Sequence, residues 1–404
     1  MAVFTGNRSE YGLLYPILRA IAADPRLEYQ LLVGGAHLNQ DSGGTAAEIA
    51  RDGFRIAREV RMPARPEGRG YTSQSIADGV QCLAGILEEL QPDLVLIYGD
   101  RFESFAATIA ATQMNFPVAH VEGGDYTEGG ALDDSVRHAM TKLAHLHFTT
   151  NEQAAERVRK LGEEAWRVSN VGLPALDLAR QGEFTPAEEL TAEFGFDLAR
   201  PVVLFCQHSI ATEPEKAAEQ VAPSLHALAM LGAAGYQILI TYPNNDAGGR
   251  AIIAEIQEFQ KRARTRIRGD EESEQAGIPG ARIVPSLGRR RFHGMLNLMG
   301  SAGRGVLAGN SSAGIKETRA FGCPCVNIGS RQSGRLRCEN VIDTDYDTGA
   351  IVAAVQRAIE DDAFRRQCRT CENVYGSGDS GKRIADALAT VEIDARLLQK
   401  RLTY

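Results

Sequence analysis

The sequence predicts an α/β protein with two Rossmann-like, doubly wound domains, and three observations support this fold class. Short apolar runs alternate with longer amphipathic segments along most of the 404 residues. Residues 94–98 form a continuous apolar run directly after the helical pattern at 73–90, and such strands between helices are typical of a parallel sheet covered on both faces. A polar stretch at 177–199 interrupts the pattern, which restarts at 202–205. Because the length exceeds that of one ordinary core, we expect two domains.

Each expected element rests on the spacing of its apolar residues. Short continuous apolar runs indicate strands, and apolar residues three and four apart indicate helices, as at Ile76, Val80, Leu83 and Leu87. In the first half we expect strands at 2–5, 29–33, 94–98 and 118–121, and helices at 11–23, 73–90, 103–112 and 133–145. In the second half we expect strands at 202–205, 237–240, 282–284, 305–308 and 325–328, and helices at 215–231, from 250 and after 309. Residues 263–280 are poor in apolar side chains and indicate a solvated loop or a helix end.

Composition and charge exclude several functional classes. Hydrophobic residues make up 44% of the chain and charged residues 24%, as in soluble globular proteins. The net charge of −8 argues against general nucleic-acid binding, which needs a basic face. An anionic substrate would therefore have to be held by local arginines. No apolar stretch approaches the ~20 residues of a membrane span and no signal peptide precedes the first strand, so we expect a cytoplasmic protein without a membrane partner.

The seven cysteines predict no chemistry of their own. Cys323 and Cys325 form a C-x-C pair and Cys368 and Cys371 a C-x-x-C pair, but neither pair has ligand partners at zinc-site spacing. We expect reduced, structural thiols. The histidines are too scattered in sequence to indicate a metal site, and no G-x-x-x-x-G-K-[ST] or G-x-G-x-x-G motif is present. Neither ATP hydrolysis nor dinucleotide binding is thus the first hypothesis, and we expect no cofactor.

Polar residues follow the predicted strands of the first half, at the positions where doubly wound sheets bind ligands. Arg8 follows the first strand and can place a fixed cation there, although an arginine paired to a surface carboxylate is equally compatible with the sequence. Asp100 follows the strand at 94–98 and is either a helix N-cap, the favoured interpretation, or a cleft carboxylate. Glu122 follows a buried strand, and a functional role is favoured because burying an unpaired carboxylate is costly.

Two further features belong to this group of carboxylates. Gly123 and Gly124 follow Glu122 and would let the backbone approach a ligand. Asp133 and Asp134 open the next helix, where acidic residues are ordinary partners of the helix dipole. Several carboxylates at one sheet edge could divide the proton transfers of one reaction, since crowded acids raise one another's pKa.

In the second half, the segment 309–317 carries the strongest signal. A short apolar strand ends at Gly309, and Ser311 and Ser312 open a helix, where free backbone N–H groups and the helix dipole suit a phosphate. Glu317 is placed to accept ribose hydroxyls. The alternative is an N-cap with nothing bound. His208 also follows a strand and is either a polar contact to a phosphate or sugar or a packed loop histidine.

Taken together, these segments resemble the hydrolysing UDP-N-acetylglucosamine 2-epimerases of sialic- and legionaminic-acid-type pathways. The match covers nearly the whole chain. In the first half it rests on G-N-R-S-E-Y-G at 6–12, Y-G-D-R-F-E at 98–103, H-V-E-G-G-D at 120–125 and D-D-S-V-R-H-A-M-T-K-L-A-H-L-H-F at 133–148. In the second half it rests on P-N-N-D-A-G at 243–248, G-N-S-S-A-G-I-K-E at 309–317 and G-S-R-Q-S-G-R at 329–335.

The resemblance implies a glycosyltransferase-B-like architecture with the active site in the cleft between the domains. The implied divisions are an N-terminal domain at 1–178 carrying the catalytic carboxylates, a UDP-binding domain at 199–380, and a C-terminal helix at 381–404 that packs back on the first domain. The implied catalytic residues are Asp100, Glu122, Asp133, Asp134 and His208, with individual acid and base roles open. The implied substrate-binding residues are Arg8, Arg101, Asn244, Ser311, Ser312, Gly314, Glu317, Arg331 and Arg335.

The implied reaction needs neither a metal nor a nicotinamide. UDP leaves as the C2 proton is removed, giving a 2-acetamidoglucal, and water then adds at C1 to release N-acetylmannosamine. The family also implies a UDP-sugar partner and a homodimer or higher homo-oligomer. One departure concerns 125–132, which looks longer than in shorter members and has Asp125 where many have Glu. It leaves the 4- and 6-substituents of the sugar open, so UDP-N,N′-diacetylbacillosamine is an alternative substrate.

Three other functions remain open from the sequence. A non-hydrolysing epimerase usually opens with G-T-R-P-E, whereas this chain has G-N-R-S-E at 6–10. A retaining glycosyltransferase of the same architecture keeps fewer carboxylates in its first domain. A nucleotide-sugar-binding regulator without turnover would be favoured by loss of Glu122 or Asp100, and both are present.

Overall fold

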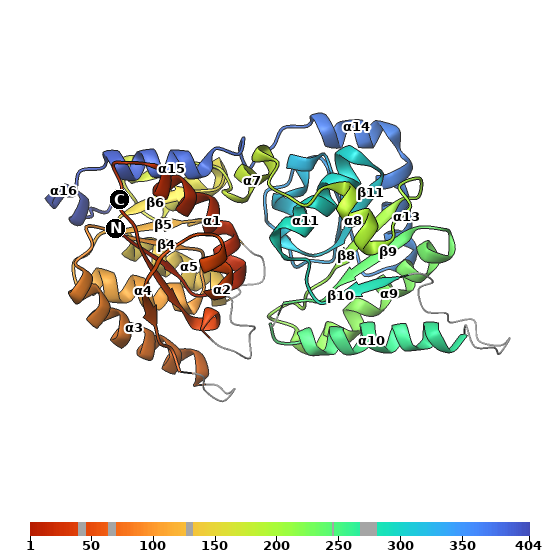
Figure 1. Ribbon diagram of the computed structural model, residues 1–404, viewed down its shortest axis with the longest axis horizontal. Helices are drawn as coiled ribbons and strands as arrows, with labels where there is room; N and C mark the ends of the chain where they lie inside the picture. The colour runs from red at the N-terminus through yellow and green to blue at the C-terminus, as the bar shows by residue number, and fades with distance from the viewer. Residues whose placement is uncertain (39–45, 64–69, 127–131, 245, 267–280) are drawn as a thin grey trace. The chain divides into compact units, whose positions relative to one another are not determined.

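The computed structural model describes residues 1–38, 46–63, 70–126, 132–244, 246–266 and 281–404. The chain divides into two compact α/β units (Figure 1). Unit 1 comprises Met1–Tyr126, Leu132–Leu178 and Tyr375–Tyr404, and unit 2 comprises Ala179–Val374. The C-terminal segment therefore belongs to the same unit as the N-terminus.

Unit 1 contains a seven-stranded sheet in the order β3-β2-β1-β4-β5-β6-β7, and all its pairs of neighbouring strands are parallel. The strands are β1 (Ala2–Thr5), β2 (Gln30–Gly34), β3 (Ile56–Val60), β4 (Val95–Tyr98), β5 (Val118–Val121), β6 (Leu146–Thr149) and β7 (Val168–Asn170). The helices are α1 (Arg8–Ala23), η1 (Gly35–His37), α2 (Ala46–Arg51), α3 (Tyr71–Leu90), α4 (Phe102–Gln113), α5 (Leu132–Leu143), α6 (Glu152–Lys160), η3 (Ala165–Arg167), α7 (Ala175–Gln181), α15 (Ser380–Thr390) and α16 (Ala395–Leu398).

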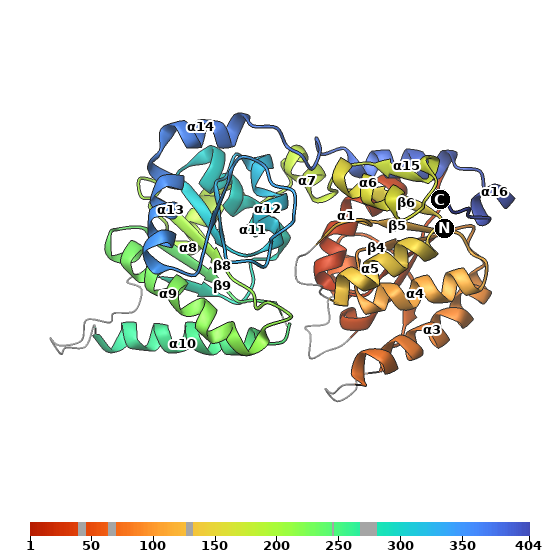
Figure 2. The ribbon, with the colours of Figure 1, turned by 180° about the vertical axis from the view of Figure 1, so that it is seen from behind.

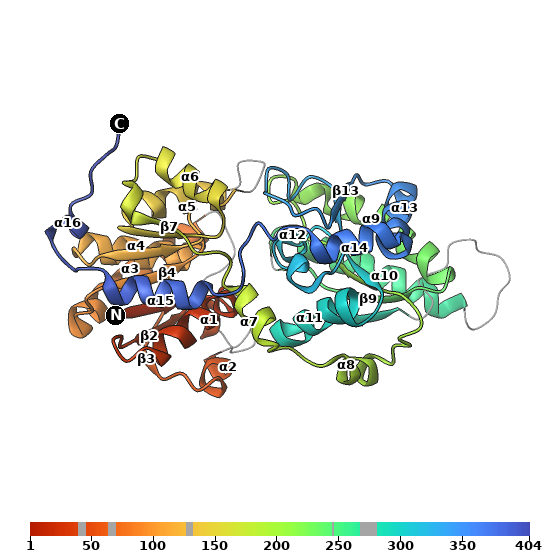
Figure 3. The same ribbon diagram turned by 90° about the horizontal axis from the view of Figure 1, so that it is seen from above.

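Successive residues of a strand in unit 1 enter different cores, as the two-residue period of a strand requires. Val3 and Leu96 belong to the core that includes residues of α1 and α15, and α15 lies along α1 (Figure 3). Phe4 and Val95 belong to the core on the opposite face, where α3, α4 and α5 lie side by side (Figure 2). Because both faces are covered, the central strands are buried throughout, and the carboxyl edge of the sheet is left to position polar side chains.

Unit 2 repeats this architecture with a six-stranded parallel sheet in the order β10-β9-β8-β11-β12-β13. The strands are β8 (Val202–Cys206), β9 (Gln237–Thr241), β10 (Arg282–Val284), β11 (Gly305–Gly309), β12 (Cys325–Ile328) and β13 (Val341–Thr344). The helices are α8 (Ala187–Phe194), η4 (Pro214–Lys216), α9 (Ala217–Ala233), α10 (Gly249–Arg266), α11 (Gly288–Asn297), the π-helix η5 (Leu298–Ala302), α12 (Ser312–Lys316), η6 (Thr318–Phe321), α13 (Thr348–Glu360) and α14 (Asp362–Thr370).

The two faces of this sheet also have separate cores. Val203 and Val306 pack with residues of α9 and α13, whereas Leu204 and Leu307 pack with residues of α8 and α11. The predicted α/β fold with two doubly wound sheets is therefore confirmed, while the predicted cleft between the domains stays a prediction.

Several predicted elements are corrected by the structure. The expected helix at 133–145 ends at Leu143, and residues 146–149 form strand β6. This strand was missed because its polar residue His147 is buried and paired with Glu163 Oε2 at 3.0 Å. The expected C-terminal helix is two helices, because the Asp394 side chain accepts from the Leu397 N–H and starts α16 separately.

Residues 267–280, expected to form a loop or helix end, lie outside the described residues, and so does most of the long segment at 125–132. None of the seven cysteines is in a disulfide. No helix in the described part of the chain is both long and apolar enough to cross a membrane.

Candidate functional site

Glu122 lies directly after β5 in a backbone conformation that is unusual for a residue with a side chain. Its φ is +70°, its N–H donates to the Phe148 carbonyl over 2.8 Å, and its residue surface is 8% exposed. The other described non-glycine residues with positive φ, Gln91 and Asn115, follow helices. A left-handed carboxylate residue at a buried strand end is strained, and such strain is concentrated at functional sites.

The glycines after Glu122 serve packing within unit 1. A Cβ on Gly123 would lie 3.0 Å from Thr141 Oγ1 of α5, and one on Gly124, whose φ is +74°, would lie 2.3 Å from the Ala154 carbonyl of α6. Close packing against α5 and α6 therefore already requires these glycines. Their expected approach to a ligand stays a prediction.

Arg137 is the centre of the carboxylate group at this edge. Its guanidinium is 5% exposed and forms an ion pair with Asp100, while Nη1 donates to Asp134 Oδ1 at 2.7 Å and to the Asp125 carbonyl at 2.9 Å. Burial alone would lower the pKa of Arg137, but the carboxylates around it, including Glu122, raise it above the usual range. A buried cation of this kind compensates the cost of gathering several carboxylates in one place.

The structure decides between the two interpretations of Asp100. The N-cap of α4 is Arg101, which makes no side-chain cap bond, and Asp100 is instead paired with Arg137. The favoured N-cap interpretation is therefore wrong. Asp134 is buried, whereas Asp133 in the same first turn of α5 is exposed. Arg137 was missed as a site residue, although its spacing of three from Asp134 was a usable signal.

His120 holds the turn that carries Asp100. Its side chain is fully buried on β5, with Nε2 2.7 Å from the Gly99 carbonyl and Nδ1 3.3 Å from Thr141 Oγ1. Burial lowers the pKa of His120 to about 3, so the ring is neutral. Nε2–H then donates to Gly99, Nδ1 accepts from Thr141, and His120 connects the end of β4 to α5.

A second pair of carboxyl groups lies near the end of β1. Glu10 and Glu103 are buried, Ser104 Oγ donates to Glu10 Oε2 at 3.1 Å, and Arg101 Nε donates to Glu103 Oε2 at 3.3 Å. Burial, and then the neighbouring Glu103, raise the pKa of Glu10 to about 8. Arg8 is the first residue of α1, and its side chain lies outside the described part of the structure.

In unit 2, the ends of β8 and β11 are tied together by Asn310. Gly309 has a φ of +130°, and a Cβ there would lie 2.0 Å from the Cys206 carbonyl. Asn310 Oδ1 accepts from the His208 N–H at 2.7 Å, and Asn310 Nδ2 donates to the His208 carbonyl at 2.9 Å. This buried asparagine places the loop carrying His208 beside the loop carrying Ser311.

His208 also connects to the loop after β9. Its Nδ1 accepts from the Asn244 N–H at 3.0 Å, and its Nε2 lies 3.4 Å from Cys206 Sγ. Burial, and then the nearby Arg331, lower the pKa of His208 to about 3, so its ring is neutral. The ring is therefore packed and hydrogen-bonded, as one of the two interpretations expected, and its contact with a phosphate or sugar stays a prediction.

The helix after Gly309 is short. Ser311 is the N-cap of α12 and makes no side-chain cap bond, and Ser312 is the first helical residue. The Gly314 N–H donates to the Ser311 carbonyl at 3.0 Å, and a Cβ on Gly314 would lie 2.8 Å from Cys325 Sγ. Gly314 therefore allows α12 to pack against β12.

Glu317 follows α12 and is held by a residue that the sequence did not single out. His293 Nε2, on α11, donates to Glu317 Oε2 over 2.7 Å. The His293 ring is 3% exposed and packs against Phe321, with ring centroids 5.2 Å apart. No sequence pattern predicts this pair, because its members are on separate elements.

The cations after β12 stabilise the same loop. Arg331 Nη1 and Gln332 Nε2 both donate to the Asn310 carbonyl, at 3.1 and 2.9 Å. Arg335 Nη1 donates to Gln332 Oε1 at 3.0 Å, so Arg335 acts on this loop through Gln332. Among the described residues, no group of three or more His, Cys, Asp or Glu side chains is arranged to hold a metal ion.

Comparison with known proteins gives consistent matches along the chain. A family model described as UDP-N-acetylglucosamine 2-epimerase matches residues 19–389. A "UDP-N,N'-diacetylbacillosamine 2-epimerase (hydrolyzing)" of Legionella pneumophila is 31% identical over 99% of this chain and 98% of its own length. A "UDP-N-acetylglucosamine 2-epimerase" of Neisseria meningitidis is 30% identical over 98% of this chain and 97% of its own. The crystal structure of UDP-GlcNAc 2-epimerase from Neisseria meningitidis bound to UDP-GlcNAc has a TM-score of 0.76 at 16% identity, covering 96% of this chain and 99% of that one.

Proposed function

Since the chain belongs to the UDP-N-acetylglucosamine 2-epimerase family, we propose that it is a hydrolysing member that converts UDP-N-acetylglucosamine to N-acetylmannosamine and UDP. The proposed reaction begins when a base removes the C2 proton and the C1–O bond to UDP breaks, which gives UDP and 2-acetamidoglucal. Water then adds its oxygen to C1, and a proton returns to C2 on the opposite face. The first step needs a base and a stabilised leaving group, and the second needs an acid that serves the other face.

The observation that carries this proposal is the carboxylate group around Arg137 at the carboxyl edge of the unit 1 sheet. Glu122 is buried in a strained conformation, and Arg137 fixes the carboxylate of Asp100. We assign the proton transfers at C2 to Glu122, Asp100 and Asp133. Asp134 is paired through Nη1 of Arg137, and we assign it the role of positioning that guanidinium.

Unit 2 supplies the features expected of a UDP site. The Ser311–Ser312 segment starts a helix at a strand end, where backbone N–H groups favour a phosphate. The carboxylate of Glu317 is fixed by His293 and is suited to accept the two ribose hydroxyls. We propose that the neutral His208 ring and Arg331 serve the diphosphate, because Arg331 provides a cation in the same loop cluster.

The hydrolysing outcome is favoured over the non-hydrolysing one by the opening motif and by the relatives. The Legionella relative bears the description "hydrolyzing" and matches almost end to end. A "GDP/UDP-N,N'-diacetylbacillosamine 2-epimerase (hydrolyzing)" of Campylobacter jejuni is 30% identical over 85% of this chain. The same relatives make UDP-N,N′-diacetylbacillosamine a second candidate substrate for the same reaction.

Proton NMR in deuterated water tests the proposal directly. The protein is incubated without added metal with UDP-N-acetylglucosamine, and the Glu122→Gln variant serves as control. Free N-acetylmannosamine deuterated at C2, together with UDP, is the expected result. UDP-N-acetylmannosamine would overturn the hydrolysing assignment, and turnover of the bacillosamine derivative alone would overturn the substrate assignment. Unchanged turnover in the control variant would overturn the assignment of Glu122.

A further inference from the structure

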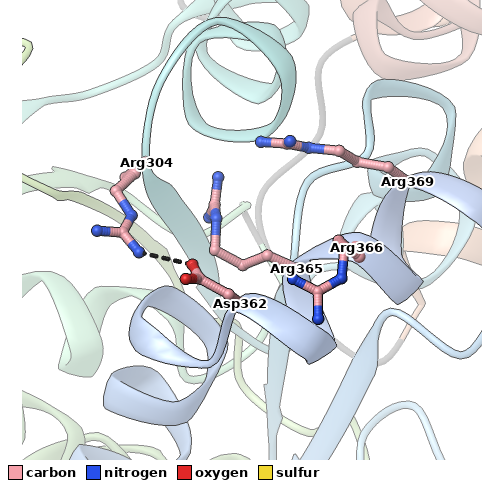
Figure 4. A pocket seen from close by; sticks show the side chains of 5 residues that line it. All are labelled: Arg304, Asp362, Arg365, Arg366 and Arg369. Atoms are coloured by element: carbon pink, nitrogen blue, oxygen red, sulfur yellow. Dashed lines mark hydrogen bonds and ion pairs between the residues drawn. The ribbon is translucent and has the colours of Figure 1, made fainter.

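A cavity of about 260 Å³ lies in unit 2, at the edge of the sheet opposite to the Ser311–Ser312 loop. It is lined by Arg304, Asp362, Arg365, Arg366 and Arg369 (Figure 4). Arg304 directly precedes β11, whereas Gly309 ends β11 and leads into the candidate nucleotide loop. The two positions are five residues apart along an extended strand, roughly 16 Å at about 3.3 Å per residue. The cavity is therefore separate from the candidate active site.

Arg365 forms the floor of this cavity and has an unmet hydrogen-bonding group. The residue is 5% exposed, and its Nη2 donates to the Gly303 carbonyl at 2.8 Å. Its Nη1 is buried and has no hydrogen-bond partner among the described residues. A buried guanidinium donor without an acceptor is costly, so an acceptor brought by a ligand would be favoured here.

The rim adds further positive charge around that floor. Arg304, Arg366 and Arg369 are exposed, and Arg304 and Arg369 are close enough to act electrostatically on Arg365. Figure 4 shows the guanidinium of Arg365 between those of Arg304 and Arg369. The lining carries four arginines and one aspartate, so its formal charge is +3. Repulsion among these cations is relieved by an anion of more than one charge.

Asp362 partly neutralises the rim in the present structure. Its Oδ1 accepts from Arg304 Nη2 at 3.0 Å (Figure 4), and its side chain is 73% exposed. An exposed ion pair of this kind is weak, so a ligand with a denser charge can displace it. The lining offers no aromatic surface on which a nucleobase could stack.

We propose that this cavity is an anion-binding site for a small phosphate-type oxyanion with at least two negative charges, such as pyrophosphate or the diphosphate group of a nucleotide. The guanidinium forks of Arg304 and Arg365 match the spacing of phosphate oxygens and can donate to them in pairs. Recognition in this site is by charge and hydrogen bonding. It does not depend on which reaction the protein catalyses.

Isothermal titration calorimetry with inorganic pyrophosphate tests the site, with one molar equivalent of UDP present so that the candidate nucleotide loop is filled. We expect pyrophosphate to bind, Arg304→Gln and Arg366→Gln each to weaken binding about five- to tenfold, and Asp362→Asn to tighten it severalfold. Arg200→Gln is the matched control, because Arg200 is an exposed arginine two residues before β8 at the same edge and does not line the cavity. It should leave binding unchanged.

The exposed variants are used because Arg365→Gln would also remove the bond to Gly303 and could prevent folding. Absence of pyrophosphate binding, or equal affinity in wild type, Arg304→Gln and Arg366→Gln, would overturn the proposal. Repeating the titration with inorganic phosphate and with excess UDP identifies the source of the anion. If a second equivalent of UDP binds and this binding is lost in Arg304→Gln, the bound anion belongs to a nucleotide. If pyrophosphate binds but no second equivalent of UDP does, the site takes a free inorganic anion.

Discussion

His293 Nε2 donates to Glu317 Oε2 over 2.7 Å, and this bond fixes a carboxylate that we assign to the ribose. Both partners are largely enclosed, with side chains 3% and 14% exposed. The carboxylate is therefore oriented before a ligand arrives. Preorganisation of this kind lowers the entropy that binding has to lose.

Replacing His293 by Phe keeps a buried ring but removes the donor to Glu317. We expect UDP to bind about three- to tenfold more weakly, because a hydrogen bond to a charged group contributes about 1 kcal/mol or more. Calorimetric titration with UDP measures this effect. His293→Gln retains a donor and should recover most of the affinity, and equal UDP affinity in the Phe variant would refute the role of this contact.

Glu122→Gln is expected to abolish turnover while leaving UDP affinity within a few-fold, because the amide cannot exchange the C2 proton. Initial rates and UDP titrations on one preparation separate the two effects. Full activity in this variant would contradict the acid/base assignment.

The backbone at Glu122 gives an independent prediction on stability. Its φ of +70° is unfavourable for any side chain and acceptable for glycine. We therefore expect Glu122→Gly to unfold at a higher denaturant concentration than Glu122→Ala, by about 1 kcal/mol in the free energy of unfolding. Equal stability of the two variants would show that the conformation is not strained.

Arg137→Met should destabilise the protein by about 3–5 kcal/mol, because it leaves Asp100 and Asp134 without their buried cation. Adding Asp134→Asn to the Arg137→Met variant removes one of the two carboxylate charges that have lost their cation. The double variant is therefore expected to be more stable than the sum of the two single effects predicts. Urea unfolding of the four proteins measures the coupling, and additive effects would argue against a charge-compensated group.

Most central strands could be predicted from the sequence, whereas the edge strands β3 and β13 could not, and burial explains the difference. β4 and β5 are buried at each position, so they are apolar throughout. β3 and β13 are at sheet edges and are half exposed. Their residues Ile56–Val60 and Val341–Thr344 mix charged and apolar side chains, which breaks the continuous apolar run on which the prediction relied.

The same comparison shows which residues of the candidate site could be predicted from the sequence. Glu122 and Ser311 could be found because they stand one and two residues after the ends of apolar strands. His120, which holds the turn that carries Asp100, and His293, which holds Glu317, act across separate elements, and sequence spacing carries no information about such pairs. Asp100 was interpreted as a helix cap because it precedes a helix in the sequence. A carboxylate that pairs with Arg137 instead stands at the same sequence position, so the sequence alone does not distinguish the two.

Glu10 gives a pH dependence that follows from its burial. Its pKa is raised from 4.5 to about 8 by burial and then by Glu103, so between these values the folded protein binds a proton that the unfolded chain releases. The stability from this group is fully present below pH 4.5 and is lost as pH rises to about 8. The expected loss is of order 5 kcal/mol.

Glu10→Gln mimics the protonated acid and should remove most of the decline in folding stability between pH 4.5 and 8. We expect the variant to be more stable than wild type at pH 8.5 and similar to it at pH 5, as measured by urea unfolding at both values. Glu88→Gln on the exposed face of α3 is the matched control and should leave the wild-type pH dependence unchanged. Parallel curves for wild type and Glu10→Gln across this range would show that Glu10 is already ionised in the folded protein.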